Sequence, residues 1–494
     1  MDVWGALLII LYAANLVSVF SLLFIDKKDT GTTFSWILVF VFLPWLGFLF
    51  YLFFGSTKKL KLFSKKYSLE RLNEQYQKIL EKNIDSIKHD DIRYNDFHME
   101  KYKDIIELNA KNAESVYSQD NSVQLLINAK AKYEMMFREI EEAKESINVL
   151  YFIIKGKDES GKKFISLLAK KAREGVEVRL IYDTMGFMKT SRKDFKELEE
   201  AGGMVYGFLP SVLRTLLQAN YRMHRKMVII DGLIAYTGGI NIGDDYLGMD
   251  PVKTPWRDTS IRLTGSCVQE IQLTFLSDWT YLDKQIAKKK AYPSKVEDDK
   301  HLKMYFKHPK EIGTTGVQVL LSGPDKVYTT IKDSYLKMIN DAKRYVYIQT
   351  PYLVPDEATF NALRIAAQSG VDVRIMIPGI PDKKFVYYVS LSFVEELLRN
   401  GIKIYTYNGF IHAKTCVFDD AAASIGTANF DMRSFMINYE MNTMIYDSKF
   451  SLECKETFLN DIHDSTELSY DQYQKRSWLQ KLRESFWRLV SPLA

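Results

Sequence analysis

The sequence predicts an α/β fold of two similar halves, each a mixed sheet flanked by helices, behind an N-terminal hairpin of two membrane-spanning helices. Three observations predict this arrangement: a strand–helix–strand pattern that occurs twice, a set of polar residues that recurs at matched spacing, and two long uncharged stretches at the start of the chain. A chain of 494 residues is also too long for one ordinary core and favours two or three domains.

The two uncharged stretches lie at about residues 3–24 and 34–54. Each is long enough to cross a hydrocarbon core of roughly 30 Å, and each span must be helical because lipid gives the backbone no other partner. No basic residue precedes the first stretch, which argues against a cleaved signal peptide. We expect a transmembrane hairpin at 1–56, with a kink or a close helix contact at Pro44 and Gly47. The alternative is a buried hairpin of a soluble protein.

Positive charge predicts how the hairpin is oriented. Five lysines follow the second stretch, whereas the two lysines between the stretches are balanced by two aspartates. The five are Lys58, Lys59, Lys61, Lys65 and Lys66. The positive-inside rule places this cluster, the N-terminus and the bulk of the chain in the cytoplasm. The three cysteines, Cys267, Cys416 and Cys454, are far apart in sequence and fit a reducing compartment.

The chain after the hairpin repeats one plan. An apolar strand-like run, a helix, a glycine and a second apolar run follow one another in each copy, an order typical of a βαβ unit with parallel strands. These segments are 147–152, 164–172 and 176–182 in the first copy, and 345–348, 360–368 and 371–377 in the second. We expect a cytoplasmic connector at 57–120, the two halves at 121–300 and 301–470, and a C-terminal amphipathic helix at 471–494.

The strongest functional signal is a four-residue motif that occurs once in each half. His, Lys, Asp and Asn keep the same spacing in His224, Lys226, Asp231 and Asn241 and in His412, Lys414, Asp419 and Asn429. Side chains at positions i and i+2 of a strand face the same side, so each His and its Lys are expected to point into one site. Two imidazoles, two ammoniums and two amides around one small volume suit a phosphodiester.

A phosphodiester gives most of these groups a role. One neutral His attacks phosphorus and forms a phosphohistidine, while the other gives a proton to the leaving alkoxide and later takes one from the incoming alcohol. The phosphate charge would be held by Lys226, Asn241, Lys414 and Asn429. Asp231 and Asp419 belong to the catalytic motif by position, or they fix turns at the strand ends. No cluster has metal-ligand spacing, so we expect neither a metal nor a cofactor.

A histidine that must present one ring nitrogen usually has the other held by a carboxylate. Asp258 and Glu440 follow the two motifs at comparable distances along the chain. We therefore expect Asp258 to orient His224 and Glu440 to orient His412.

These motifs resemble the HxKxxxxD signature of the phospholipase D superfamily, and the chain is similar to its bacterial cardiolipin synthases. The similarity covers nearly all of the chain after the hairpin and includes Asn220-Tyr221-Arg222, Trp256-Arg257-Asp258 and Asn438-Tyr439-Glu440. It implies a phosphatidyltransferase of the bacterial cell membrane that converts two phosphatidylglycerol molecules into cardiolipin and glycerol. It also implies His224 as the nucleophile and His412 as the general acid and base. Two departures are minor: Asn128 stands where family members often have Gly, and Met223 where Asn is common.

The same residues would serve other reactions. A phospholipase D-type hydrolase or another transphosphatidylase would differ only in the acceptor. Nucleic acid is not expected as a partner, because the net charge of +5 comes without a long basic stripe. A non-catalytic membrane scaffold would not require two intact His-Lys pairs. Membrane lipids are the expected partners, and the sequence leaves the oligomeric state open.

The C-terminal tail is predicted to be amphipathic. Apolar residues repeat there at helical spacing, at Trp478, Leu482, Phe486, Leu489 and Leu493, with basic residues among them. Such a helix either lies at the lipid interface or packs onto the body of the protein.

Overall fold

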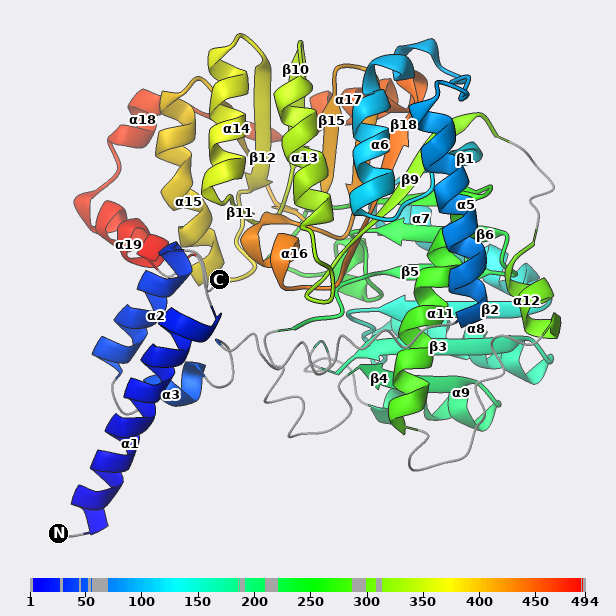
Figure 1. The fold of residues 1–494 in the computed structure, drawn as a ribbon, viewed down its shortest axis with the longest axis horizontal. Helices are drawn as coiled ribbons and strands as arrows, with labels where there is room; N and C mark the ends of the chain where they lie inside the picture. The colour runs from blue at the N-terminus through cyan, green and yellow to red at the C-terminus, as the bar shows by residue number, and fades with distance from the viewer. Residues whose placement is uncertain are drawn as a thin grey trace.

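The computed structural model describes residues 3–26, 30–43, 46–51, 55, 70–184, 186, 192–208, 221–286, 299–307, 313–489 and 491. The lysines at 58–66, which were expected to set the orientation, lie outside this range, as do Asn220 and Leu493. A sheet with helices on both faces forms the body, and the N-terminal helices lie beside it (Figure 1).

One sheet of 15 strands runs through the body. The first half contributes β1 (Ser118–Ile127), β2 (Ser146–Tyr151), β3 (Glu177–Asp183), β4 (Met204–Phe208), β5 (Met227–Ile230), β6 (Ile234–Gly238) and β8 (Thr259–Thr264). The second half contributes β9 (Thr315–Ser322), β10 (Tyr345–Gln349), β12 (Asp372–Pro378), β13 (Lys403–Tyr407), β15 (Thr415–Phe418), β16 (Ala422–Gly426), β18 (Glu440–Tyr446) and β19 (Ser465–Leu468).

The strand order is the same on both sides of the centre. The halves meet where β1 pairs with β9, and outward from there the order is β1-β8-β6-β5-β2-β3-β4 in one half and β9-β18-β16-β15-β10-β12-β13 in the other. Only β19 at one edge has no counterpart among the strands that the structure describes. The predicted α/β fold of two similar halves is confirmed.

The predicted βαβ units are present in both halves. In the first, α8 (Glu159–Arg173) connects β2 to its parallel neighbour β3, and in the second α14 (Glu357–Gln368) connects β10 to β12. Gly175 and Gly370 follow these helices with φ of 91° and 93°, a conformation that glycine adopts without steric cost. The glycines therefore end the helices and release the chain into the next strand.

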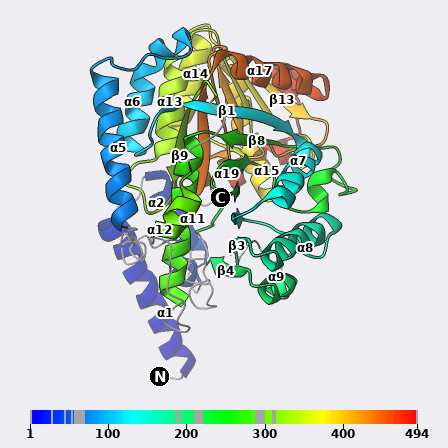
Figure 2. The same cartoon turned by 90° about the vertical axis from the view of Figure 1, so that its right-hand side faces the viewer.

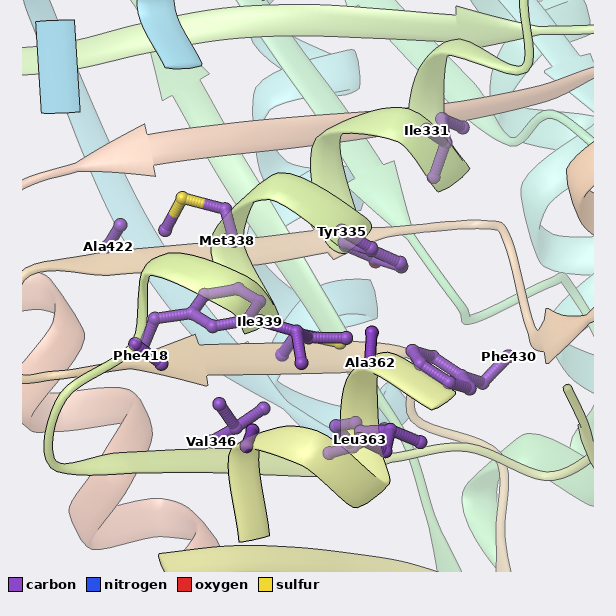
Figure 3. Close-up of a cluster of buried hydrophobic side chains, with 14 of the residues drawn as sticks. Ile331, Tyr335, Met338, Ile339, Val346, Ala362, Leu363, Phe418, Ala422 and Phe430 are labelled. Atoms are coloured by element: carbon purple, nitrogen blue, oxygen red, sulfur yellow. The ribbon is translucent and has the colours of Figure 1, made fainter. Parts of the chain in front are cut away.

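Alternation along the strands distributes side chains between two faces. Val228 and Ile230 of β5 pack under α8 and α7 (Asn128–Glu142), whereas Met227 and Ile229 enter a core on the opposite face. That opposite core is shared by both halves and is covered by α11 (Cys267–Ile286) and α17 (Ser448–His463). In the second half the first face is covered by α13 (Thr330–Asp341), α14 and α15 (Lys384–Arg399). Leu363, Phe418 and Val346 belong to one buried cluster there, and the Tyr335 ring of the same cluster stacks on Phe430 (Figure 3).

The predicted connector is part of this fold. Its helix α6 (Lys103–Asn112) lies between α5 (Glu70–Lys88) and α13 (Figure 2), and Ile105 and Ile106 are fully buried in the core of the second half. The helix α12 (Asp299–Tyr305) lies at the predicted boundary and contacts the first half, where His301 is 3.2 Å from Glu177.

The N-terminal segment forms α1 (Val3–Phe20), a π-helical continuation at Ser21–Asp26, α2 (Thr30–Phe42) and the short α3 (Gly47–Phe50). Among the described residues, Leu7–Asp26 is long and apolar enough to cross a membrane, and Thr30–Phe42 is a shorter apolar helix. The second predicted span is thus divided into α2 and α3, and two complete spans remain a prediction. At Gly47 an added Cβ would lie 2.9 Å from the Phe40 ring, which is the close helix contact expected there.

The C-terminal helix α19 (Trp478–Leu489) follows α18 (Tyr470–Gln474) and packs on α15 with its polar face. Arg488 lies 2.8 Å from Glu396, and Arg476 pairs with both Glu395 and the buried Glu484. The apolar face is open, since Trp478, Leu479, Leu482, Phe486 and Leu489 are each at least half exposed. Packing on the body is therefore confirmed for one face only.

Candidate active site

The two motifs meet at one cavity between the halves. The cavity has a volume of about 2060 Å³, and both His224 and His412 line it together with Asn241 and Asn429. It extends to the N-terminal helices, where Trp36 and other apolar residues of α2 form part of its wall. The prediction that both copies contribute to one site is consistent with this arrangement.

Each histidine is held by a carboxylate of the other half. The distance from His224 Nδ1 to Glu440 Oε2 is 2.8 Å, and that from His412 Nδ1 to Asp258 Oδ2 is 2.7 Å. The expected pairing of Asp258 with His224 and of Glu440 with His412 is therefore wrong. The two carboxylates were identified correctly, but their partners are exchanged.

The backbone explains the exchange. The halves are joined by short parallel strand pairs. In one of them β7 (Trp256–Arg257) pairs with β14 (Phe410–Ile411), which ends directly before His412. The His412 N–H donates to the Arg257 carbonyl at 2.7 Å. In the same way, the His224 N–H donates to the Tyr439 carbonyl at 3.0 Å. Each histidine thus enters the site beside the residue that precedes the other half's carboxylate.

The carboxylates are fully buried and fixed in place. Glu440 accepts hydrogen bonds from the Thr427 hydroxyl at 2.6 Å and from the Asn438 amide at 3.0 Å. The backbone of Asp258 exchanges two hydrogen bonds with Asn128, whose φ of 66° explains why a glycine also suits that position. Thr427 and Asn438 were not predicted as site residues, although both lie close in sequence to residues that were.

The surroundings of both imidazoles favour the neutral form. Burial, reinforced by Lys226, lowers the pKa of His224 to about 4 even though Glu440 acts in the opposite direction. Burial and Lys414 likewise lower the pKa of His412 to about 4, against the attraction of Asp258. A carboxylate can only accept, so Nδ1 carries the proton of each neutral ring and Nε2 keeps a free lone pair.

The lysines lie deeper than their histidines. Lys226 and Lys414 are buried and do not line the cavity, and each Nζ donates to the carbonyl of its own histidine, at 2.7 Å and 2.6 Å. Burial lowers the pKa of Lys226 to about 7 and that of Lys414 to about 8. Both lysines lie beneath the histidines, where their protonated forms place positive charge next to the site.

The asparagines lie at the cavity surface and are partly engaged. Asn241 donates to the Tyr246 hydroxyl at 2.7 Å and accepts from the Ile153 N–H at 3.2 Å. Asn429 donates to Asp431 at 3.1 Å. Each amide group retains an N–H that a phosphate oxygen could accept.

The aspartates of the motif lie elsewhere. Asp231 accepts from the backbone N–H groups of Lys144, Glu145 and Ser146 at 2.7 to 2.9 Å, and Asp419 accepts in the same way from residues 343–345. Both have φ of 52°, and neither lines the cavity. This geometry fixes the start of β2 and β10, and we assign neither aspartate a contact with substrate.

Comparison with known proteins gives one consistent result. Residues 136–251 and 335–462 match the family model described as "Cardiolipin synthase, PLD-like domain", and residues 13–56 match the phospholipase D-nuclease N-terminal model. The chain is 41% identical over 500 residues to the major cardiolipin synthase of Bacillus subtilis strain 168, and 39% identical over 497 residues to a cardiolipin synthase of Listeria welshimeri. Both alignments cover 100% of each chain.

A solved structure shares the fold at much lower identity. Phosphatidylserine synthase of Haemophilus influenzae Rd KW20 superposes with a TM-score of 0.60 at 15% identity, over 79% of this chain and 100% of that one. The full-length identity to curated enzymes is the stronger finding. The chain belongs to the bacterial cardiolipin synthases of the phospholipase D superfamily, and is a membrane-associated phosphatidyltransferase.

Proposed function

We propose that the enzyme transfers a phosphatidyl group from one phosphatidylglycerol to the terminal hydroxyl of another, giving cardiolipin and free glycerol through a phosphohistidine. The observation that carries this proposal is the pair of crossed His–carboxylate contacts at one cavity, with two buried lysines beneath them. The resemblance to the superfamily assigns His224 as the nucleophile and His412 as the general acid and base.

In the first step, Nε2 of His224 attacks the phosphorus of the donor lipid. A P–N bond forms, the P–O bond to glycerol breaks, and protonated His412 gives its proton to the leaving oxygen. In the second step, the acceptor hydroxyl loses its proton to His412 and attacks phosphorus. The P–N bond breaks, a new P–O bond forms, and His224 is restored.

The first step requires one neutral and one protonated imidazole. With a pKa of about 4, both rings are neutral near pH 7 before substrate binds. A bound phosphodiester brings a negative charge next to the rings, and a nearby anion raises the pKa of an imidazole. Asp258 stabilises the positive charge that then forms on His412. Binding of the substrate therefore promotes the protonation of His412, which then acts as the general acid.

The lysines and asparagines stabilise the phosphate in the transition state. The anion also raises the pKa of Lys226 and Lys414, so both are held as ammoniums when substrate is bound. Fixed positive groups in a buried site are worth more than they are in water, and they need no reorganisation during the reaction.

We further propose that the hairpin crosses the membrane twice and that the catalytic part is cytoplasmic. Trp36 and Val39 of α2, with Leu43 just after it, line the same cavity as the histidines, which gives the acyl chains of a bound lipid an apolar wall beside the site. The open apolar face of α19 continues this surface, because the Ser35 hydroxyl of α2 donates to the Leu489 carbonyl at 2.8 Å. An anchored enzyme also meets its lipid substrates at high effective concentration.

The test is an assay of the full chain in vesicles that contain radiolabelled phosphatidylglycerol. Cardiolipin and free glycerol in equal amounts support the proposal, phosphatidic acid alone indicates a hydrolase, and no turnover by folded protein indicates a scaffold. Given a labelled phosphatidyl donor with a p-nitrophenyl leaving group, which departs without a proton, His412→Ala enzyme denatured with detergent at neutral to mildly alkaline pH should carry covalent lipid label and His224→Ala should carry none. Label on neither variant, or label on His224→Ala alone, would contradict the assigned roles.

A further inference from the structure

The catalytic cavity holds a second group of cations that the mechanism does not use. Seven cationic side chains outside the two motifs line the cavity: Lys155, Arg222, Lys253, Lys326, Lys332, Lys383 and Arg433. Four of them pair with carboxylates, namely Lys155 with Asp245, Lys253 with Asp382, Lys326 with Glu114 and Lys332 with Asp356. Arg222, Lys383 and Arg433 are grouped by the effect of their charges on one another, not by a lack of partners, and we call them the cation cluster. Among the residues that the structure describes, no carboxylate forms an ion pair with Arg222 or Lys383.

Two members of the cation cluster come from segments that cross beside His224. Arg222 precedes His224 by two residues in an extended segment, so both side chains face the cavity while Met223 between them is buried. The Arg222 carbonyl accepts from the Tyr439 N–H at 2.9 Å, and the Arg433 carbonyl accepts from the Asn438 N–H at 3.0 Å. The two arginines are therefore held close together by one backbone crossing.

Lys383 reaches the cluster from the loop before α15. The loop is held by its neighbour Asp382, which accepts from the Tyr352 hydroxyl at 3.0 Å and pairs with Lys253. Lys383 itself is an exposed residue on the rim of the cavity. The cluster thus extends from beside the nucleophile to the cavity mouth.

The three positive charges repel one another. Burial and the repulsion of Arg222 lower the pKa of Arg433 to about 10. Partial desolvation at the cavity rim lowers the pKa of Lys383, Asp382 opposes this shift, and the charges of both arginines lower the pKa further. The pKa values of the two histidines, in contrast, are set by burial, their carboxylates and the motif lysines. Arg222, Lys383 and Arg433 thus gather positive charge in the same cavity, beside the two motifs and outside them.

We propose that Arg222, Lys383 and Arg433 bind the phosphate of the acceptor phospholipid. This inference rests on the proposed function, in which the acceptor keeps its own phosphodiester while its terminal hydroxyl attacks the phosphohistidine. That phosphate lies one glycerol unit from the attacking oxygen, so it needs a second anion site in the same cavity. Guanidinium groups suit it, because they donate two parallel hydrogen bonds to phosphate oxygens.

Soluble acceptors with and without a phosphate test this site independently of how the enzyme binds the donor lipid. The full chain in vesicles of phosphatidylglycerol is given either labelled glycerol, which lacks a phosphate, or labelled sn-glycerol 3-phosphate, which carries one. The wild type should use glycerol 3-phosphate in preference to glycerol, and inorganic phosphate should compete with glycerol 3-phosphate only. In Lys383→Gln the preference should fall roughly tenfold, as expected for loss of one charge-assisted hydrogen bond. Cardiolipin formation should fall by a similar factor relative to glycerol exchange.

Lys384→Gln is the matched control, since it removes the same charge from the adjacent residue, which does not line the cavity. It should behave as the wild type in every assay. Arg433→Lys keeps the charge and should retain more of the preference than Arg433→Gln. Equal losses in both exchange reactions, or an unchanged preference in Lys383→Gln, would overturn the inference. Glycerol exchange by the wild type without any cardiolipin would instead overturn the proposed function, and this inference with it.

Discussion

His224 donates its Nδ1 proton to Glu440, a residue 216 positions away in the other half of the molecule. The reciprocal contact joins His412 to Asp258, 154 positions away. Neither half can therefore assemble an oriented histidine alone. Duplication of the motif gives two reactive rings, and packing of the halves against each other orients both.

Replacement of the two carboxylates should affect different steps. Glu440→Gln and Asp258→Asn should each lower kcat for cardiolipin formation by about 10²- to 10⁴-fold, the usual contribution of a positioned acid or base. A phosphatidyl donor with a p-nitrophenyl leaving group needs no general acid, because p-nitrophenolate leaves without a proton. Asp258→Asn should therefore still release one equivalent of p-nitrophenol in a burst, and Glu440→Gln should not. The opposite result would mean that Glu440 does not act on the nucleophile.

The rate should depend on pH through four buried groups. Below about pH 4 the histidines become protonated and His224 loses its nucleophilic lone pair, so kcat/KM should fall as pH falls through that value. The pKa values of Lys226 and Lys414 are about 7 and about 8 in the free enzyme, and above them the ammoniums that attract phosphate become neutral. We expect kcat/KM to fall as pH rises through this range, whereas kcat falls only at higher pH because bound phosphate keeps the lysines charged. A profile of kcat/KM that stays flat to pH 9 would contradict the role of the lysines.

Much of the architecture followed from the sequence, because it depended on local patterns. The runs at 147–152 and 345–348 became β2 and β10, and the matched spacing of His224 and His412 placed them at equivalent sites. Asp258 and Glu440 were identified by the same repetition.

The pairing of Asp258 and Glu440 could not be predicted, because spacing along one half does not show which segment of the other half lies opposite. The contacts that decide it are pairings of only two residues per strand, between β7 and β14. The depth of Lys226 was missed for a related reason. The alternation of side chains along a strand shows which face Lys226 occupies. It does not show that this long side chain turns back toward its own backbone to reach the His224 carbonyl.

Asp231 should matter for stability and little for chemistry. Asp231→Ala leaves three backbone N–H groups without their carboxylate and places alanine at a φ of 52°, so we expect a loss of roughly 1.5–3 kcal/mol in the free energy of unfolding. Asp231→Asn, which keeps an acceptor and tolerates this φ, should lose less. Thermal unfolding in detergent measures the difference, and kcat per folded molecule should stay within about twofold of the wild type. A large fall in kcat of Asp231→Ala with an unchanged melting temperature would show that Asp231 is a catalytic residue.

The open face of α19 should lie in lipid while its polar face stays on α15. A spin label at Leu482→Cys should then be accessible to oxygen, which concentrates in the bilayer, and protected from a water-soluble nickel complex. A label at Gln472→Cys, an exposed position in α18, should behave in the opposite way and serves as the control.

Full burial of one Leu or Phe side chain is worth roughly 1.5–3 kcal/mol, so the double variant Leu482→Glu/Phe486→Glu should detach the helix. Its activity should fall in vesicles but not in detergent, where the substrate no longer has to be drawn from a flat membrane surface. Equal activity of this variant and the wild type in vesicles, together with nickel access at position 482, would place the helix in water.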